Sequence, residues 1–276
     1  MTAVFNSVDY TREGANNAVV LVSLNRAPSA ITTVSVVVSN PSAASAIPYQ
    51  LEFSPGGQQE DMVVLQSQDN NTFEGTQPYS VTLEVIAGDP CYVGQVAVLE
   101  TEDRDNDFRI FTTGPVTPGQ GEFQGVSGAD DICQRAANDR GISSTFKAML
   151  VDGTNRVANT DPWGQSGAMD WVLQNNSHYY RNDDLQLAFS TTGLALVQFI
   201  YNENLANPLS PTTEGAYWTG MGDHWVTEGD HCSRWTSGQG NGRVGNLKAE
   251  DMSAINDGPQ PCDGAHHLVC VEQPTP

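Results

Sequence analysis

The chain has no long apolar run and few basic residues. No stretch of about 18 apolar residues occurs in its 276 positions, so no segment is expected to span a bilayer. It contains 12 Lys and Arg residues against 33 Asp and Glu residues, a formal net charge of -21. Nucleic acid and anionic membranes are not expected partners, because phosphate binding needs clustered Lys and Arg. The acidity favours cations as partners, or else reflects solubility in a salty or extracellular medium.

The sequence also lacks a signal peptide and a recognisable catalytic motif. Residues 1–5 have neither a charged start nor an apolar run after them, so we expect a piece of a larger exported protein. There is no Gly-x-Ser-x-Gly elbow, no His-Glu-x-x-His pair and no glycine loop for phosphate. The sequence therefore predicts a protein that is not an enzyme.

Cysteine is present in a pattern that favours disulfides. Four of the five cysteines lie in the C-terminal part of the chain, at Cys133, Cys232, Cys262 and Cys270. Four cysteines allow three pairings, and the residues alone do not choose among them. If oxidised, they place the protein outside the cell or on its surface. Cys91 is left over, and we expect a buried, inert thiol there, with pairing between molecules as the alternative.

Residues 1–106 are predicted to form an antiparallel β-sandwich. β-branched runs mark the expected strands, at residues 20–24, 34–38, 81–85 and 96–99. Turn-forming residues lie between these strands, at positions 40–41, 54–57 and 88–90. Strands that recur every 10–20 residues or so, without a helical period, are typical of such a sandwich.

The order of motifs in residues 1–106 resembles a Calx-β domain. The motifs are Glu13-Gly14 before a strand, Phe53-Ser-Pro-Gly56, Asp69-Asn-Asn-Thr-Phe-Glu74, and an acidic run at residues 102–107. The resemblance implies a calcium site at one end of the sandwich, with the ligands Glu13, Asp69, Glu74, Asp103 and Asp105. Calcium takes six to eight oxygen ligands, which suits such carboxylates.

Three positions depart from the pattern of that family. Asn70 and Gln77 stand where acids are frequent, and Arg104 interrupts the terminal acidic run. Fewer carboxylates weaken calcium binding. The alternative interpretation is an acidic turn that is only solvated.

Residues 107–276 are predicted to form a second domain of the α+β class. A strand is expected at residues 108–112. Ser127 is predicted to cap a helix, with Asp130 three residues later near its positive end, and Gly141 to end it. Further strands are expected at residues 145–151 and 268–271, with a long loop-rich region between them.

This order is similar to the C-type lectin-like fold, and most similar to its endostatin-type branch. The resemblance is carried by Gly-Ala-Asp-Asp-Ile-Cys133, Thr-Phe-Lys-Ala-Met-Leu150, Trp218-Thr-Gly220, Cys232-Ser-Arg-Trp235, and the stretch from Cys262 to Cys270. Endostatin-like domains of this kind occur in bacterial surface proteins of the leptospiral type, several of which bind host matrix or serum proteins. The resemblance implies the disulfides Cys133–Cys270 and Cys232–Cys262.

A ligand-contacting surface is predicted in residues 218–235 and 238–246. Aromatic and arginine side chains are frequent at the centres of interfaces, and loops on a rigid scaffold usually make the contacts. The candidate residues are Trp218, His224, Trp225, Arg234, Trp235, Asn241 and Arg243. The alternative is a solvated loop without a ligand. Calcium-dependent sugar binding is not expected, because Ile255 replaces the Trp of a Trp-Asn-Asp motif.

Taken together, these features predict a non-enzymatic adhesion or recognition protein that is extracellular or at the cell surface. The second domain is expected to bind a protein or glycan ligand, and the first, with calcium as its cofactor, to present it. Neighbouring modules of a longer parent chain are further expected partners. The alternative is a structural spacer of a large extracellular adhesin or matrix protein, with no ligand of its own.

Overall fold

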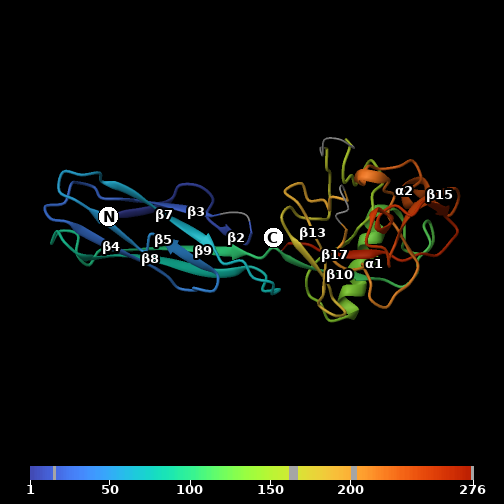
Figure 1. Ribbon diagram of the computed structural model, residues 1–276, viewed down its shortest axis with the longest axis horizontal. Coiled ribbons are helices and arrows are strands. Elements are labelled where there is room, and N and C mark those ends of the chain that lie inside the picture. The colour runs from blue at the N-terminus through green and yellow to red at the C-terminus, as the bar shows by residue number, and fades with distance from the viewer. Residues whose placement is uncertain (15–16, 162–166, 200–203, 275–276) are drawn as a thin grey trace. The chain divides into compact units, whose positions relative to one another are not determined.

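The structure is a computed structural model that describes residues 1–14, 17–161, 167–199 and 204–274 (Figure 1). The chain divides into two units, Met1–Asn106 (unit 1) and Asp107–Pro276 (unit 2). Each unit has a hydrophobic core of its own. Among the described residues, no helix is long and apolar enough to cross a membrane.

Unit 1 is a sandwich of two β-sheets. One sheet has the strand order β1-β3-β7-β5 and the other the order β2-β9-β8-β4-β6. Paired strands run antiparallel, except that β2 runs parallel to β9. The strands are β1 (Thr2–Phe5), β2 (Thr11–Arg12), β3 (Ala18–Ser23), β4 (Thr32–Val38), β5 (Ala44–Ile47), β6 (Gln50–Phe53), β7 (Glu60–Ser67), β8 (Gln77–Ala87) and β9 (Val96–Arg104).

Side-chain alternation places the core of unit 1 between its two sheets. On β3, Ala18, Val20 and Val22 are buried, and the residues between them are only half-buried. A strand turns successive side chains to opposite faces, so every second residue reaches the core. The same pattern buries Val81 and Leu83 on β8. The sandwich predicted from the sequence is confirmed.

The described residues of unit 2 form two sheets and one long helix, α1 (Gly125–Asp139). The larger sheet has the order β11-β17-β10-β12-β13, and the smaller the order β14-β15-β16. The strands are β10 (Asp107–Thr112), β11 (Phe146–Ala148), β12 (His178–Arg181), β13 (Leu187–Ser190), β14 (Ala216–Trp218), β15 (Asn241–Asn246), β16 (Pro259–Pro261) and β17 (Val269–Glu272). Short helical turns are η2 (Asp223–Trp225), α2 (Cys232–Trp235) and η3 (Met252–Ala254).

Two disulfides cross-link unit 2. Cys133–Cys270 joins α1 to β17, and Cys232–Cys262 joins α2 to the segment after β16. This is the pairing that the resemblance implied. All four sulfurs belong to residues of one buried cluster that also contains Trp218 and Trp235. The disulfides therefore lie inside the core and fix the ends of unit 2 to each other.

The predicted start of the helix is wrong. Ser127 lies inside α1, which begins at Gly125 with Gln124 in the N-cap position. Asp130 does not serve the helix end either, because its carboxylate accepts hydrogen bonds from Arg156. The predicted end is right, since Gly141 follows the helix with a φ of 74°.

The prediction of a buried thiol at Cys91 is also wrong. Cys91 is exposed and forms no disulfide. It lies in the turn between β8 and β9, where its backbone N–H donates to Asp89 Oδ1 at 2.8 Å. Its backbone is held by this turn, and its side chain interacts with Arg26.

Candidate metal site and candidate ligand surface

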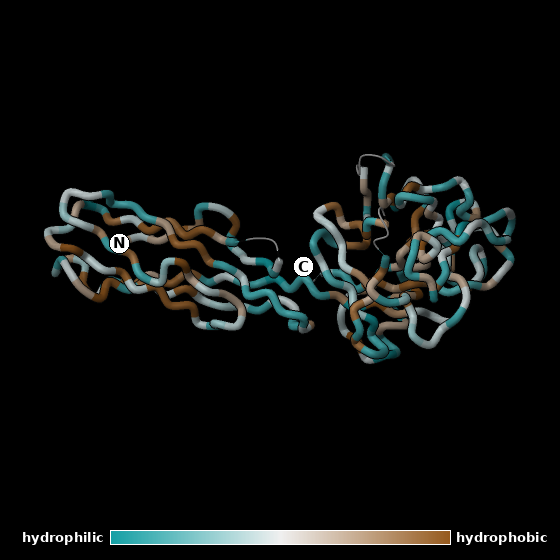
Figure 2. Tube along the Cα trace, viewed as in Figure 1, coloured by the Kyte–Doolittle hydropathy of each residue, from teal (hydrophilic) through white to brown (hydrophobic). Residues whose placement is uncertain are grey.

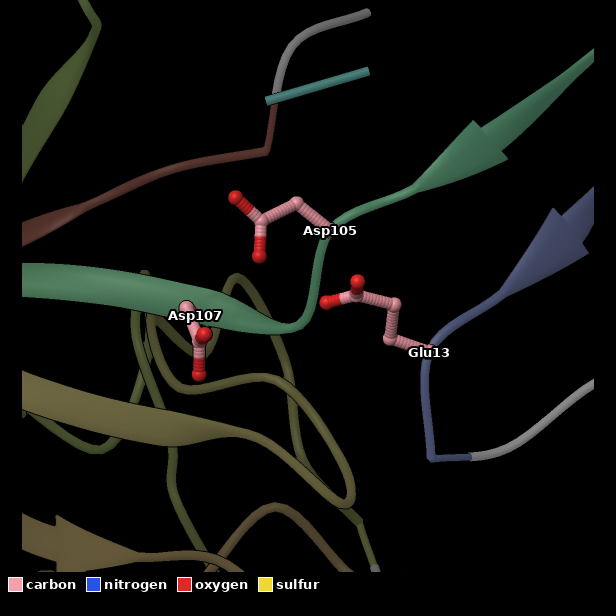
Figure 3. A group of neighbouring side chains, drawn as sticks. All are labelled: Glu13, Asp105 and Asp107. Atoms are coloured by element: carbon pink, nitrogen blue, oxygen red, sulfur yellow. The ribbon is translucent and has the colours of Figure 1, made fainter. Parts of the chain in front are cut away.

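Acidic side chains gather at the end of unit 1 where strand β9 finishes. Carboxylate oxygens of Glu13, Asp105 and Asp107 lie within 4.8 Å of one another (Figure 3). Glu13 follows β2 directly, and Asp105 follows β9. Oxygens bound to one calcium ion, each about 2.3–2.6 Å from it, lie no more than about 5 Å apart. The spacing of these three carboxylates therefore fits calcium.

Asp103 adds a buried carboxylate to this end of the sandwich. Its residue is 3% exposed, and Ser67 Oγ donates to its Oδ2 at 3.0 Å. Its Oδ1 is buried, and none of the described residues donates a hydrogen bond of normal geometry to it. Burial raises the pKa of Asp103, the hydroxyls of Thr11 and Ser67 oppose this, and the charges of Asp105 and Glu74 reinforce it. A buried carboxylate in this state would gain from a nearby cation.

The two remaining predicted ligands are exposed. Asp69 Oδ2 lies 3.7 Å from the position that a Cβ on Gly14 would take, so Asp69 is close to the turn after Glu13. Glu74 contributes its backbone, because the N–H groups of Glu74 and Gly75 donate to Asp105 Oδ2 at 2.7 and 2.8 Å. Glu13 and Asp105 are thus brought together, and the loop with Asp69 and Glu74 lies beside them.

Local geometry explains two other residues at this end. Asn70, a departure from the family pattern, donates from Nδ2 to Glu13 Oε1 at 2.9 Å and so orients that carboxylate. Gly14 has a φ of 64°, and a Cβ on it would stand 2.6 Å from Asn106 Nδ2. Only glycine accepts both the backbone conformation and the close approach.

Asp107 was not among the residues predicted to bind calcium. A signal was present, because Asp103, Asp105 and Asp107 occupy every second position of an extended segment. Side chains two residues apart on an extended chain project to the same side. Asp107 was counted in the acidic run at residues 102–107, but it was not included among the calcium ligands.

Three tryptophans that were predicted to contact a ligand are buried. Trp218, Trp225 and Trp235 are 0%, 3% and 0% exposed. Their ring N–H groups donate to backbone oxygens at 2.8–3.0 Å, those of Val116, Val197 and Val151 respectively. A ring without exposed surface does not touch a ligand, so the prediction is wrong for these residues. Large aromatic side chains with a satisfied N–H build the core of unit 2 instead.

The turn α2 has an unusual backbone. All four residues of Cys232–Trp235 have positive φ, between 50° and 64°. Each L-residue is destabilised by roughly 1–2 kcal/mol in this left-handed conformation. The disulfide to Cys262 and the buried ring of Trp235 hold the turn in place. As a result, Arg234 is presented to solvent.

The polar candidates lie at the surface around Arg243. Arg243 Nη1 donates to Asn256 Oδ1 at 2.8 Å, and its Nε lies 3.7 Å from Asp230 Oδ2. Asn256 in turn donates from Nδ2 to Asp223 Oδ1 at 2.8 Å. A guanidinium, an amide and two carboxylates are thus connected, and we call these four residues the Arg243 cluster.

Two further predicted contacts, Asn241 and His224, lie near members of this cluster in the sequence. Asn241 is exposed but begins strand β15, so the predicted loop at residues 238–246 is a strand over much of its length. His224 is half-buried and has a φ of 58°. Its backbone oxygen accepts a hydrogen bond from Asn159 Nδ2 at 3.1 Å.

Residues 117–252 match a family model. The family is described as "Protein of unknown function (DUF1554)", and the match lies within unit 2 and covers just under half of the chain. Its description assigns no activity. No curated protein matches the sequence.

Several solved structures superpose loosely on the chain. The periplasmic chaperone SfaE has a TM-score of 0.31 at 12% identity, with 38% of this chain and 58% of that chain covered. The calcium binding domain CBD12 of CALX1.1 has a TM-score of 0.29 at 14% identity, with 42% and 54% covered. The CsuC–CsuE chaperone–tip adhesion subunit complex of Acinetobacter baumannii has 0.29 at 11%, with 56% and 74% covered. We draw no conclusion about function from superpositions at this level.

Proposed function

We propose that this chain is a non-enzymatic extracellular recognition protein whose first unit binds calcium. In this proposal unit 1 is a Calx-β domain, and unit 2 is a C-type lectin-like domain that binds a protein or glycan. The observation that carries the proposal is the approach of the carboxylates of Glu13 and Asp105 at the end of unit 1 that also holds the buried carboxylate of Asp103.

Electrostatics favours a cation at this group. Like charges within a few ångströms disfavour each other's ionised form, and burial of Asp103 adds to the penalty. A divalent cation offsets these charges and binds to oxygens directly. The group consists of carboxylates alone, which suits calcium better than the nitrogen- and sulfur-preferring transition metals. Glu13, Asp103 and Asp105 are the residues of unit 1 that would hold the ion.

The disulfides support an extracellular location. Two bridges persist in oxidising compartments and are rare in the cytosol. Calcium is also a common structural ion of extracellular modules, where sites of modest affinity suffice. The high acidic charge agrees with a protein that works among cations.

For unit 2, the C-type lectin-like assignment is supported by its connectivity. Helix α1 is linked to the terminal strand β17 by Cys133–Cys270, and the second bridge lies within the C-terminal half of the unit. A recognition surface on this unit would be polar. It would use the Arg243 cluster together with the exposed Arg234 and Asn241.

One observation favours the alternative function, a structural spacer without a ligand. Burial of Trp218, Trp225 and Trp235 removes the large aromatic anchors that dominate many interfaces. A spacer would bind calcium for stiffness and present no ligand surface.

Calorimetric titration tests the calcium part of the proposal. The EDTA-treated chain should release or take up heat in a saturable manner with CaCl2. The double variant Glu13→Gln/Asp105→Asn should show no such heat. Asp61→Asn, an exposed acid elsewhere on unit 1, is the matched control and should titrate like the wild type.

Binding assays separate recognition from spacing. The immobilised chain is exposed to panels of extracellular matrix proteins and glycans. Recognition predicts a ligand whose binding Arg243→Ala weakens, with melting unchanged. If the wild type binds none of either panel, the spacer function stands.

A further inference from the structure

The outward face of the β1-β3-β7-β5 sheet is apolar on all four strands. Antiparallel sheets with one solvated face normally alternate apolar residues inward and polar residues outward. Here the residues that point away from the sandwich core are Val4 on β1, Val19 and Leu21 on β3, Met62 and Val64 on β7, and Ile47 on β5. Except for the exposed Asp61 on β7, their neighbours within each strand belong to or pack on the core. We call these six residues the apolar face.

Strand register places the six residues in two adjacent rows. Val4, Leu21 and Met62 are cross-strand partners in one row, and Val19, Val64 and Ile47 form the next. Figure 2 shows the hydrophobic stretches along the strands of unit 1. At the outer corners, Val4, Ile47 and Met62 are 53%, 53% and 51% exposed.

Polar rows border the apolar face at both ends of the strands. Thr2, Ser23 and Glu60 are partners on one side, and Ser45 and Gln66 on the other. An apolar centre inside a polar rim is the usual anatomy of a protein interface.

We propose that the apolar face binds a second copy of this chain, face to face. Two chains that each carry a net charge of -21 repel, so they approach best where few carboxylates face each other. The rows described above contain one acid, Glu60, and no Lys or Arg. A partner chosen by complementary charge would find nothing to pair with at the centre of this face.

Two-fold symmetry also favours a second copy of the chain as the partner of the apolar face. A two-fold axis that runs across the strands lays the row of Val4, Leu21 and Met62 over the row of Val19, Val64 and Ile47 of the second copy. The same axis places Glu60 over Ser45 and Gln66, not over the other Glu60. Sheets of equal twist pack in this way with their strands about 30° apart.

The size of the face sets the strength of the contact. Four strands about 4.8 Å apart and four rows about 7 Å apart give roughly 540 Å² per copy. A pair then buries roughly 1,100 Å² in all, at the low end of specific interfaces. The association is therefore weak and becomes visible only at high protein concentration.

Sedimentation equilibrium of the full chain, from micromolar to millimolar concentration, tests the proposal. A reversible monomer–dimer equilibrium is expected. Its dissociation constant should fall as NaCl is raised, because salt screens the repulsion between the two acidic chains. A chain that stays monomeric at all these concentrations and salt levels overturns the proposal.

Charge insertion shows which face is used. Met62→Lys and Ile47→Lys should each raise the dissociation constant by at least about tenfold, with unchanged melting. Val98→Lys is the matched control, since Val98 is 53% exposed on the other sheet, where Thr82 is its neighbour. An equal effect of Val98→Lys contradicts the assignment.

A cross-link checks the two-fold arrangement without introducing charge. In a Cys91→Ser background, the double variant Glu60→Cys/Gln66→Cys should form covalent dimers on oxidation. Glu60→Cys alone should form far fewer. Equal yields from the two variants overturn the proposed packing.

Discussion

Arg156 donates two parallel hydrogen bonds to the carboxylate of Asp130, from Nη1 at 2.9 Å and from Nη2 at 2.8 Å. The guanidinium is fully buried. It also donates from Nη2 to Asp170 Oδ2 at 2.5 Å and from Nη1 to the backbone oxygen of Ala148 at 2.8 Å. This one side chain therefore ties α1, β11 and the segment around residue 170 together.

Arg156→Met is predicted to lower the free energy of unfolding of unit 2 by about 3–5 kcal/mol, because Asp130 and Asp170 lose a buried partner. Arg156→Lys should also destabilise, since a lysine cannot replace the bidentate fork. All five tryptophans lie in unit 2, so urea unfolding followed by tryptophan fluorescence reports on it alone. As a control, Arg135→Met removes the exposed ion pair between Arg135 on α1 and Glu122. This variant should lower the free energy of unfolding by less than about 1 kcal/mol. Equal losses in both variants contradict the prediction.

The sequence predicted those strands that bury a β-branched run. Strands β3, β4 and β8 contain the runs that predicted them. In each strand every second side chain faces the core, and this alternation is visible in the sequence. Strands β2 and β5 carry no such run. They exist because they pair with β9 and β7, and such long-range pairing is not visible in a local pattern.

The candidate site was predictable in part. The resemblance to a Calx-β domain pointed to Glu13 and Asp105, and the structure brings their carboxylates together. Whether each tryptophan is buried or exposed could not be predicted from the sequence, because aromatic rings occur both in cores and at interfaces. What decides for Trp218 and Trp235 is packing with the two disulfides, which brings together residues more than a hundred positions apart in the chain.

Loss of either disulfide should destabilise unit 2. The bridges join residues 137 and 30 positions apart, and chain entropy alone then corresponds to about 5 and about 3.5 kcal/mol. The double variants Cys133→Ala/Cys270→Ala and Cys232→Ala/Cys262→Ala should therefore unfold at lower urea, the first more than the second. The transition of unit 1, followed by far-ultraviolet circular dichroism, should not move. A reductant that leaves the fluorescence transition in place contradicts this prediction.

Asp89 gives unit 1 a dependence on acid pH. Hydrogen bonds from the backbone N–H groups of Ser29 and Cys91 and from the Ser29 hydroxyl lower the pKa of Asp89 to about 2. Its pKa in the unfolded chain is about 3.9, so the unfolded chain binds the proton first as pH falls. The stabilisation is complete above the unfolded pKa and is lost towards pH 2.

Asp89→Asn should flatten the stability of unit 1 across this acid range. Urea unfolding at a series of pH values measures the effect. Glu84→Gln, an exposed change on the preceding strand β8, serves as the control. A variant that keeps the wild-type pH dependence removes Asp89 as its cause.

Asp103→Asn is predicted to raise the melting temperature of unit 1 without calcium and to lower it with calcium. Burial raises the pKa of Asp103 in the folded chain, so ionisation favours the unfolded chain: this penalty is absent below the unfolded pKa and is complete above the raised folded pKa. At neutral pH in EDTA, the variant should therefore melt at a higher temperature than the wild type. In calcium it should melt lower, because a ligand charge is missing. The same sign in both buffers contradicts the role of Asp103.

The central claim is that calcium stabilises unit 1 through its acidic end, and scanning calorimetry of the whole chain tests it most directly. The account predicts that millimolar calcium, but not magnesium, moves the unfolding transition of unit 1 to higher temperature, by an amount that grows with concentration. The fluorescence transition of unit 2 should stay where it is. A unit 1 transition at the same temperature in EDTA and in millimolar calcium would contradict the account.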